Sequence, residues 1–122
     1  MEILNALITG TFLGYEDHGI FTFWIDVDIS GGGCVGIGNY ALDEFSHDEG
    51  KRVFKGHGLE PIARILDTVG VDSWEELKGK YIRIKSEGWG TTVDEIGNLM
   101  DDKWFNIREY FSELKASFGG QN

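Results

Sequence analysis

The chain has 122 residues, of which 41% are hydrophobic and 13% aromatic, which is enough for a single domain with a substantial core. Its formal net charge of −10 excludes general binding to nucleic acid polymers, because such binding needs a surface rich in Lys and Arg. The lone cysteine, Cys34, excludes an internal disulfide and a cysteine-based metal site.

No apolar run approaches the roughly 20 residues of a membrane-spanning helix. The N-terminus also lacks the basic and then apolar pattern of a secretory signal. We therefore expect no membrane partner and a soluble, cytoplasmic protein.

The first third of the chain predicts three antiparallel strands. Residues 20–29 alternate between apolar and polar side chains, as in a strand with one buried face. Residues 5–15 and 34–42 flank this segment and are joined to it by short turns that contain glycine. We therefore expect a three-stranded meander.

A long polar segment and a helix follow. Residues 43–58 are charged and punctuated by glycine, and they predict an extended loop that carries a short hairpin or turn. Residues 59–69 have apolar side chains at helical spacing, with Pro61 suited to the first turn and Gly70 to the C-terminal cap. Residues 73–76 form a capping-box pattern that opens a short helical turn.

The last third predicts a hairpin and a second helix. Residues 81–86 alternate as a strand, with residues 91–100 as the partner, and an amphipathic helix begins near Ile107. The fold class is α+β, with a mostly antiparallel sheet of about five to six strands and two principal helices packed on it. Residues 1–118 are expected to form one domain, and residues 119–122 a disordered tail.

The glycine-rich segment from Ser30 to Asn39 is the first candidate for a binding site. Val35 and Ile37 keep the alternation of a strand, so one face of this strand lacks side chains. A flat ligand or another backbone can approach such a face closely. Tight packing of the strand against a second subunit or a helix is the alternative explanation of the same glycines.

The cations are confined to the second part of the chain, because residues 1–50 contain no Lys or Arg. Arg52 and Arg64 are the predicted ligands of an anion, Arg64 because it lies off the apolar stripe of its helix. Phe54 or Trp104 is predicted to stack on a flat group such as a base. The segment around Arg52 has a second explanation, since charged edge strands protect sheets against aggregation.

Candidates for catalysis are few. The three histidines lie in separate predicted loops and show no metal-ligand spacing. His18 follows Glu16 and Asp17, whose carboxylates favour its protonated form, so we expect it to donate a hydrogen bond to a phosphate rather than to act as a base. Cys34 has no histidine near it in the sequence. The prediction is a binding protein with no catalytic residue, no metal and no cofactor.

Four stretches of the sequence carry a family resemblance: YEDHGIFT (15–22), the glycine-rich strand that ends in YALD (40–43), the helix start GLE (58–60), and IGN (96–98) with DKWF (102–105). Together they resemble the first type of Thoeris anti-defence proteins, a family of small phage proteins. The resemblance spans residues 1 to about 111.

Members of that family are not enzymes; they sequester a cyclic ADP-ribose-type signal made by bacterial TIR-domain proteins. They work as homo-oligomers with ligand pockets at or near subunit contacts. The resemblance implies a small anionic cyclic nucleotide as the ligand, a homodimer or higher homo-oligomer, and the host cell cytoplasm as the location. The ligand-binding residues expected from the sequence and the resemblance together are His18, Gly38, Asn39, Tyr40, Arg52, Phe54, Arg64, Lys103 and Trp104.

Two functions of other classes are alternatives. One is a small nucleotide-modifying enzyme that uses His18 as its acid–base group. The other is an acidic inhibitor that binds a host defence protein through its negative face.

Overall fold

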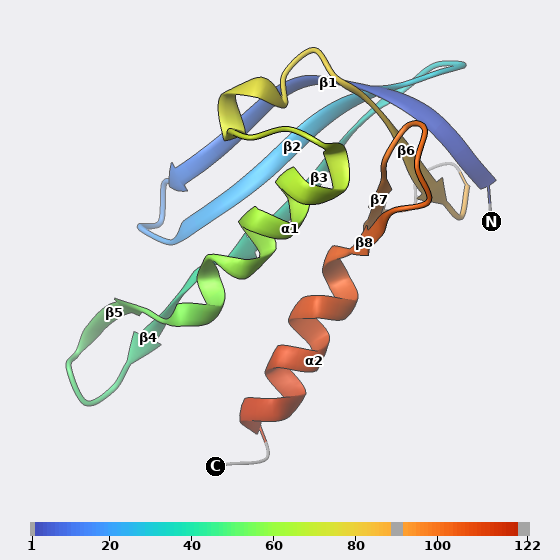
Figure 1. The fold of residues 1–122 in the computed structure, drawn as a ribbon. Helices are drawn as coiled ribbons and strands as arrows, with labels where there is room; N and C mark the ends of the chain where they lie inside the picture. Colours follow the sequence, from blue (N-terminus) through green and yellow to red (C-terminus); the bar gives the residue numbers. More distant parts are fainter. Residues whose placement is uncertain (1, 89–91, 120–122) are drawn as a thin grey trace.

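A computed structural model describes residues 2–88 and 92–119, and it has the predicted α+β architecture. Six antiparallel strands form one sheet in the order β3-β2-β1-β6-β7-β8, and β4 and β5 form a separate hairpin that projects from it (Figure 1). The strands are β1 (Glu2–Tyr15), β2 (Phe21–Ile29), β3 (Cys34–Ala41), β4 (Asp43–Ser46), β5 (Lys51–Phe54), β6 (Tyr81–Ser86), β7 (Glu95–Gly97) and β8 (Trp104–Asn106). The helices are α1 (Glu60–Val69) and α2 (Ile107–Gly119), with short 3-10 helices η1 (Gly56–Gly58) and η2 (Trp74–Glu76).

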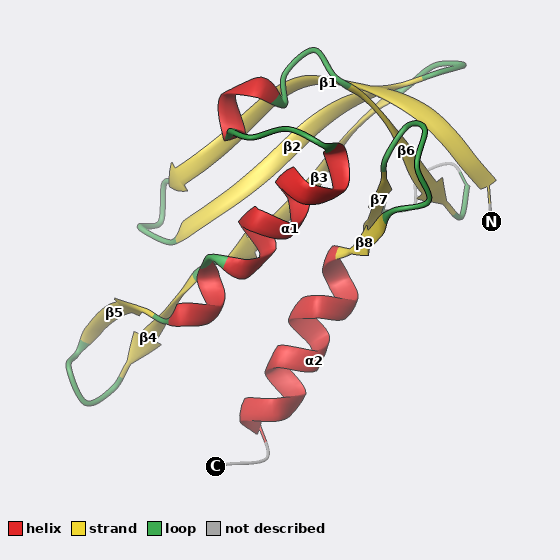
Figure 2. Ribbon diagram, in the orientation of Figure 1, coloured by secondary structure: helices red, strands yellow, loops and turns green. Residues whose placement is uncertain are grey.

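Both long helices lie on one face of the sheet, which we call the inner face (Figure 2). The apolar residues of α1 lie on its sheet-facing side, and Ile65 is fully buried there. The helix ends at Gly70, whose φ of 90° is the left-handed conformation that glycine adopts most easily. The core comprises Ala6, Ile8, Phe23, Ile25, Val27, Ile37, Leu42, Ile65, Leu77, Ile82, Ile84, Val93, Ile96, Phe105 and Ile107.

The predicted meander of β1, β2 and β3 is confirmed. Phe23, Ile25 and Val27 of β2 point into the core, so the residues between them point to the opposite, outer face. No helix among the described residues covers that outer face (Figure 2). Irregularities in register lie between Ile8 and Gly10 of β1 and opposite residues 22–24 of β2.

The predicted hairpin after residue 43, the short turn with its capping box, and the strand at residues 81–86 are also confirmed. Part of the predicted partner strand, at Thr91, and residues 120–122 of the predicted tail lie outside the described residues. Within the described part, β7 is shorter than predicted because the Asn98 side chain accepts hydrogen bonds from the Met100 and Asp101 N–H groups and closes a turn.

Trp104 and Phe105, which directly precede the predicted last helix, belong to strand β8, which was not predicted. Strand alternation sends Phe105 into the core and the Trp104 ring onto the outer face. There the ring lies over Gly97 so closely that a Cβ on Gly97 would be 2.5 Å from it. Two adjacent large rings are therefore accommodated on two faces of the same sheet.

No helix among residues 2–88 and 92–119 is both long enough and apolar enough to cross a membrane.

Candidate functional site

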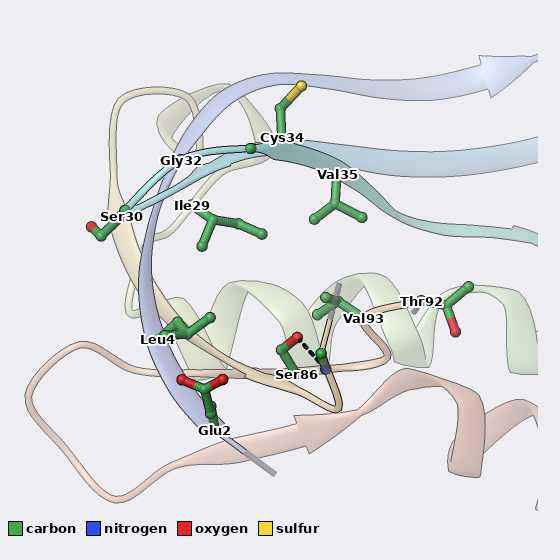
Figure 3. A pocket seen from close by; sticks show the side chains of 13 residues that line it. Glu2, Leu4, Ile29, Ser30, Gly32, Cys34, Val35, Ser86, Thr92 and Val93 are labelled. Atoms are coloured by element: carbon green, nitrogen blue, oxygen red, sulfur yellow. Dashed lines mark hydrogen bonds between the residues drawn. The ribbon is translucent and has the colours of Figure 1, made fainter. Parts of the chain in front are cut away.

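A groove runs beside β3, one of the two edge strands of the sheet. It consists of two adjoining hollows, of about 590 Å³ and about 290 Å³, which share Thr92 and Val93. Figure 3 shows the larger one, between the β2–β3 turn and the end of β6. Its lining residues are Glu2, Leu4, Ile29, Ser30, Gly31, Gly32, Gly33, Cys34, Val35, Ser86, Gly88, Thr92 and Val93.

The larger hollow has an apolar wall and a bare rim. Leu4, Ile29, Val35 and Val93 point into it from three strands and a loop (Figure 3). The three glycines 31–33 of the turn all have positive φ, and a Cβ on any of them would meet no atom within 4 Å. The turn therefore exposes backbone that a ligand can approach closely.

The smaller hollow is polar. The Tyr40 hydroxyl donates to Asp94 Oδ1 at 3.4 Å, and Thr92 Oγ1 donates to Asp94 Oδ2 at 3.3 Å. Arg108 Nη1 lies 3.8 Å from Asp94 Oδ2, and the Arg108 side chain is 70% exposed. Such a long, exposed ion pair is weak, so the guanidinium can turn to an incoming anion.

Tyr40 is held firmly in this hollow. Its ring stacks on Phe111 of α2 with centroids 4.6 Å apart and planes 6° from parallel. Burial and the negative charge of Asp94 raise the pKa of Tyr40, so its hydroxyl stays protonated at neutral pH. The residue is suited to donating a hydrogen bond, and the ring face on Phe111 is already covered.

The predicted Gly38, Asn39 and Tyr40 lie at the irregularity of β3. Gly38 and Tyr40 line the smaller hollow, whereas Asn39, with a φ of 67°, is exposed and does not line it. Gly38 has a φ of 107°, and a Cβ on it would lie 2.7 Å from the Phe23 ring. Internal packing thus already requires glycine at position 38.

Arg52, expected to bind an anion, is engaged within the chain. Its Nε and Nη2 donate to the two carboxylate oxygens of Asp43 at 3.0 and 2.8 Å, and the Asp43 side chain is only 2% exposed. Phe54, on the same hairpin, is 63% exposed and meets the edges of the Tyr15 and Phe21 rings. Its stacking on a base stays a prediction.

His18 lies in the β1–β2 turn and is also paired. Its Nδ1 is 2.9 Å from Glu16 Oε2, and this hydrogen bond, followed by the carboxylate charge, raises the pKa of His18. The expected preference for the protonated form is therefore confirmed in direction. The turn adjoins the start of β2, whereas the larger hollow adjoins its end, so His18 does not line the groove.

The remaining predicted residues lie elsewhere. The Arg64 guanidinium, expected to be free, covers the Phe105 ring at 4.3 Å and has Glu60 at 3.8 Å. Trp104 lies on the outer face, where Arg83 and Lys85 approach its ring at 4.8 and 4.4 Å. Lys103 is exposed beside it. Of the nine predicted residues, Gly38 and Tyr40 line the groove, and the other seven do not.

The sequence reasoning missed Arg108, Asp94 and Thr92. Arg108 sits in the first turn of α2, and its neighbours Ile107 and Tyr110 form the apolar stripe of that helix, so spacing places Arg108 off the stripe. The same position off the apolar stripe selected Arg64 from the sequence. Helical spacing alone does not show which of the two cations lies beside a hollow.

Cys34 is the thiol among the described residues that line the groove. Figure 3 shows the Cys34 sulfur pointing away from the larger hollow. Among residues 2–88 and 92–119 no three His, Cys, Asp or Glu side chains are grouped to hold a metal ion.

Comparison of the chain with known protein families, with curated proteins and with solved structures found no match.

Proposed function

We propose that this protein binds and sequesters a small anionic nucleotide, a cyclic ADP-ribose-type signal, and so blocks TIR-domain (Thoeris) immunity. The observation that carries the proposal is the β3 groove, which joins an apolar wall and exposed glycine backbone to the weakly paired cation Arg108. The family resemblance of the sequence points to the same class of ligand.

Each of the two hollows of the groove suits a different part of such a ligand. A volume of about 590 Å³ is within the range of small-molecule sites, and the apolar wall suits a base or a ribose ring. Arg108 and the Tyr40 hydroxyl, in the adjoining hollow, are the donors that a phosphate needs. Asp94 accepts the hydrogen bond of the Tyr40 hydroxyl and pairs only weakly with Arg108, which stays available to the ligand.

Capture without turnover is the form of binding that these residues support best. Hydrolysis of a nucleotide requires a nucleophile beside a general base. Tyr40 is protonated at neutral pH, and Cys34 points away from the larger hollow.

We further propose a homodimer or higher homo-oligomer, because exposed apolar side chains gather on and next to the β4–β5 hairpin: Leu13, Tyr15, Phe45, Phe54 and Leu59.

Calorimetry with cyclic ADP-ribose isomers, and with linear ADP-ribose for comparison, tests the proposal. Arg108→Ala should weaken binding of the tightest isomer by about 1.5–3 kcal/mol, the usual contribution of a charge-assisted hydrogen bond. Lys115→Ala, which removes an exposed cation further along α2, is the matched control and should change nothing.

Heat denaturation of the complex then distinguishes capture from turnover. Mass spectrometry should recover the isomer unchanged and in proportion to the protein. Conversion of many equivalents of the isomer per chain would contradict sequestration, and equal affinities of the Arg108→Ala and wild-type proteins would contradict this site.

A further inference from the structure

The outer face of the sheet carries an aromatic pair. Phe12 of β1 and Trp24 of β2 are direct cross-strand partners, and their rings stack with centroids 4.3 Å apart and planes 16° from parallel. Since β2 lies between β1 and β3, the second face of the Trp24 ring turns toward β3. No other ring or cation among the described residues stacks on Trp24.

The part of β3 that faces Trp24 is bare. Trp24 pairs with Gly38 and Asp26 pairs with Gly36, so neither residue has a side chain on its direct partner in β3. Gly38 is required by packing, as described above. Gly36 is different: its φ is not positive, and a Cβ there would make only ordinary contact, at 3.5 Å, with Asp26 Oδ1. Neither backbone strain nor packing explains glycine at position 36.

A carboxylate borders this space. Asp26 is exposed, and its Oδ1 and Oδ2 lie toward Gly36 and Gly10 on the two neighbouring strands. Within residues 2–88 and 92–119 no ion pair involves Asp26 or the next outward residue, Asp28. The negative charge of this region is thus uncompensated, since β1, β2 and β3 contain no Lys or Arg.

We propose that this slot, formed by Trp24, Asp26 and the backbone of Gly36 and Gly38, binds an arginine side chain of a partner protein. A guanidinium that lies flat over Gly36 and Gly38 can stack on the free face of Trp24 and donate to Asp26 Oδ1 at once. The acidic strands attract such a partner by charge complementarity. The slot and the smaller hollow share Gly36 and Gly38 but extend to opposite sides of β3, because Trp24 and Asp26 are on the outer face and Arg108 belongs to α2 on the inner face.

Arginine fits the slot better than lysine for two reasons. The guanidinium is planar and stacks on an indole ring, and it still presents N–H donors at its edge to a carboxylate. An ammonium group is compact and strongly hydrated, so it makes one of these contacts at the expense of the other.

The test uses two blocked peptides, acetyl-(Gly-Arg)₄-amide and acetyl-(Gly-Lys)₄-amide, titrated into the full chain at low salt. Calorimetry should give about fivefold tighter binding of the arginine peptide. NMR should show shifts of the Trp24 indole N–H and the Gly36 amide. Gly36→Val, a strand-compatible change that fills the slot, should remove the preference for arginine. Asp26→Asn should do the same without changing the shape of the slot, and circular dichroism checks the fold of both variants.

The control is Asp67→Asn, which removes the same charge from the exposed side of α1. It should keep the preference for arginine. The proposal is overturned if the arginine peptide does not bind, or if the wild type binds the two peptides with equal affinity. It is also overturned if Gly36→Val keeps the preference for arginine, or if Asp67→Asn and Asp26→Asn lose that preference equally. Self-association of the wild type that Gly36→Val abolishes also overturns it, because the occupant is then a second copy of the chain.

Discussion

Arg52 and Asp43 form the best-connected ion pair among the described residues, and we expect it to stabilise the fold rather than to bind ligand. Arg52→Ala should lower the free energy of unfolding by about 2–3 kcal/mol, because it leaves the buried Asp43 carboxylate without its partner. Urea denaturation measures this loss. Lys55→Ala is the control: its 3.8 Å pair with Glu44 is half exposed, so the loss should stay below about 0.5 kcal/mol.

The same pair should make stability depend on pH. Burial acts to raise the pKa of Asp43, but hydrogen bonds from Arg52 and from the Phe21 backbone outweigh it, and the pKa is lowered overall. A carboxylate with a lowered pKa contributes stability above its unfolded pKa of about 3.9, and this contribution is lost as the pH falls through its folded pKa. Asp43→Asn should therefore flatten the dependence of unfolding on pH below about 4.

His18 gives a second prediction at this scale. Because the hydrogen bond to Glu16 raises its pKa, Glu16→Gln should lower that pKa, which NMR titration of the imidazole can follow. The small stabilisation from this pair is present below about pH 6.5 and is lost as the pH rises through the folded pKa. An unchanged titration midpoint in Glu16→Gln would remove the carboxylate as the cause.

His18→Ala should leave cyclic ADP-ribose isomers chemically intact, as chromatography can show.

The cations show what spacing along a sequence can and cannot predict about single residues. Helical spacing correctly places Arg64 and Arg108 off the apolar stripes of their helices. It does not reveal that the Phe105 ring lies under Arg64 while a hollow lies beside Arg108, because both neighbours come from distant parts of the chain. The partner of Arg52, Asp43, is only nine residues away, but the register of the β4–β5 hairpin that brings them together is not evident from spacing.

Among the elements, the β4–β5 hairpin is attached to the rest of the fold by few contacts. Phe54 meets Tyr15 and Phe21 with centroids 6.5 and 5.5 Å away, and these rings join the hairpin to the β1–β2 turn. Phe54→Ala should release the hairpin locally while the sheet stays folded. Hydrogen exchange should quicken for β4 and β5 and remain slow for β2.

Phe45→Ala is the comparison for that prediction. Phe45 lies on the same hairpin, but the described ring contact it makes is with His47 in the loop of that hairpin. Its removal should leave exchange in β4 and β5 nearly unchanged. Equal effects of the two substitutions would mean that Phe54 does not attach the hairpin.

Elements with strong local signals were predictable. The alternation of β2 and the Pro61 and Gly70 signals of α1 gave correct boundaries within a residue or two, because period and caps are local properties. Strand β8 was missed because three residues are too few to show a period, and its pairing with β7 is a property of the sheet. The groove was not predictable, since it brings together the β2–β3 turn, the segment before β7 and the start of α2.

At the scale of the whole molecule, nucleotide capture and binding of a partner's arginine are proposed for different faces of the sheet. The inner face holds the core, the helices and the groove along its β3 edge. The outer face presents Trp24 and Asp26 beside the glycines of β3. The projecting hairpin and the adjoining start of α1 form a third surface, which carries the exposed apolar side chains Phe45, Phe54 and Leu59 and is distant from the β2–β3 turn (Figure 1).

That third surface is where we expect copies of the chain to associate. Leu59 is 77% exposed at the N-terminal end of α1, beside the hairpin, and burying such side chains favours association. Leu59→Glu should therefore convert a dimer into a monomer of 13.7 kDa at micromolar concentration, measured by light scattering. The fold should tolerate the change, because an acidic side chain is favourable at a helix N-terminus. Met100→Glu places the same charge at an exposed apolar residue in the β7–β8 turn and should leave the dimer intact. A wild-type protein that is monomeric throughout this range would contradict the oligomer, and a dimer that survives Leu59→Glu would move the contact to another surface.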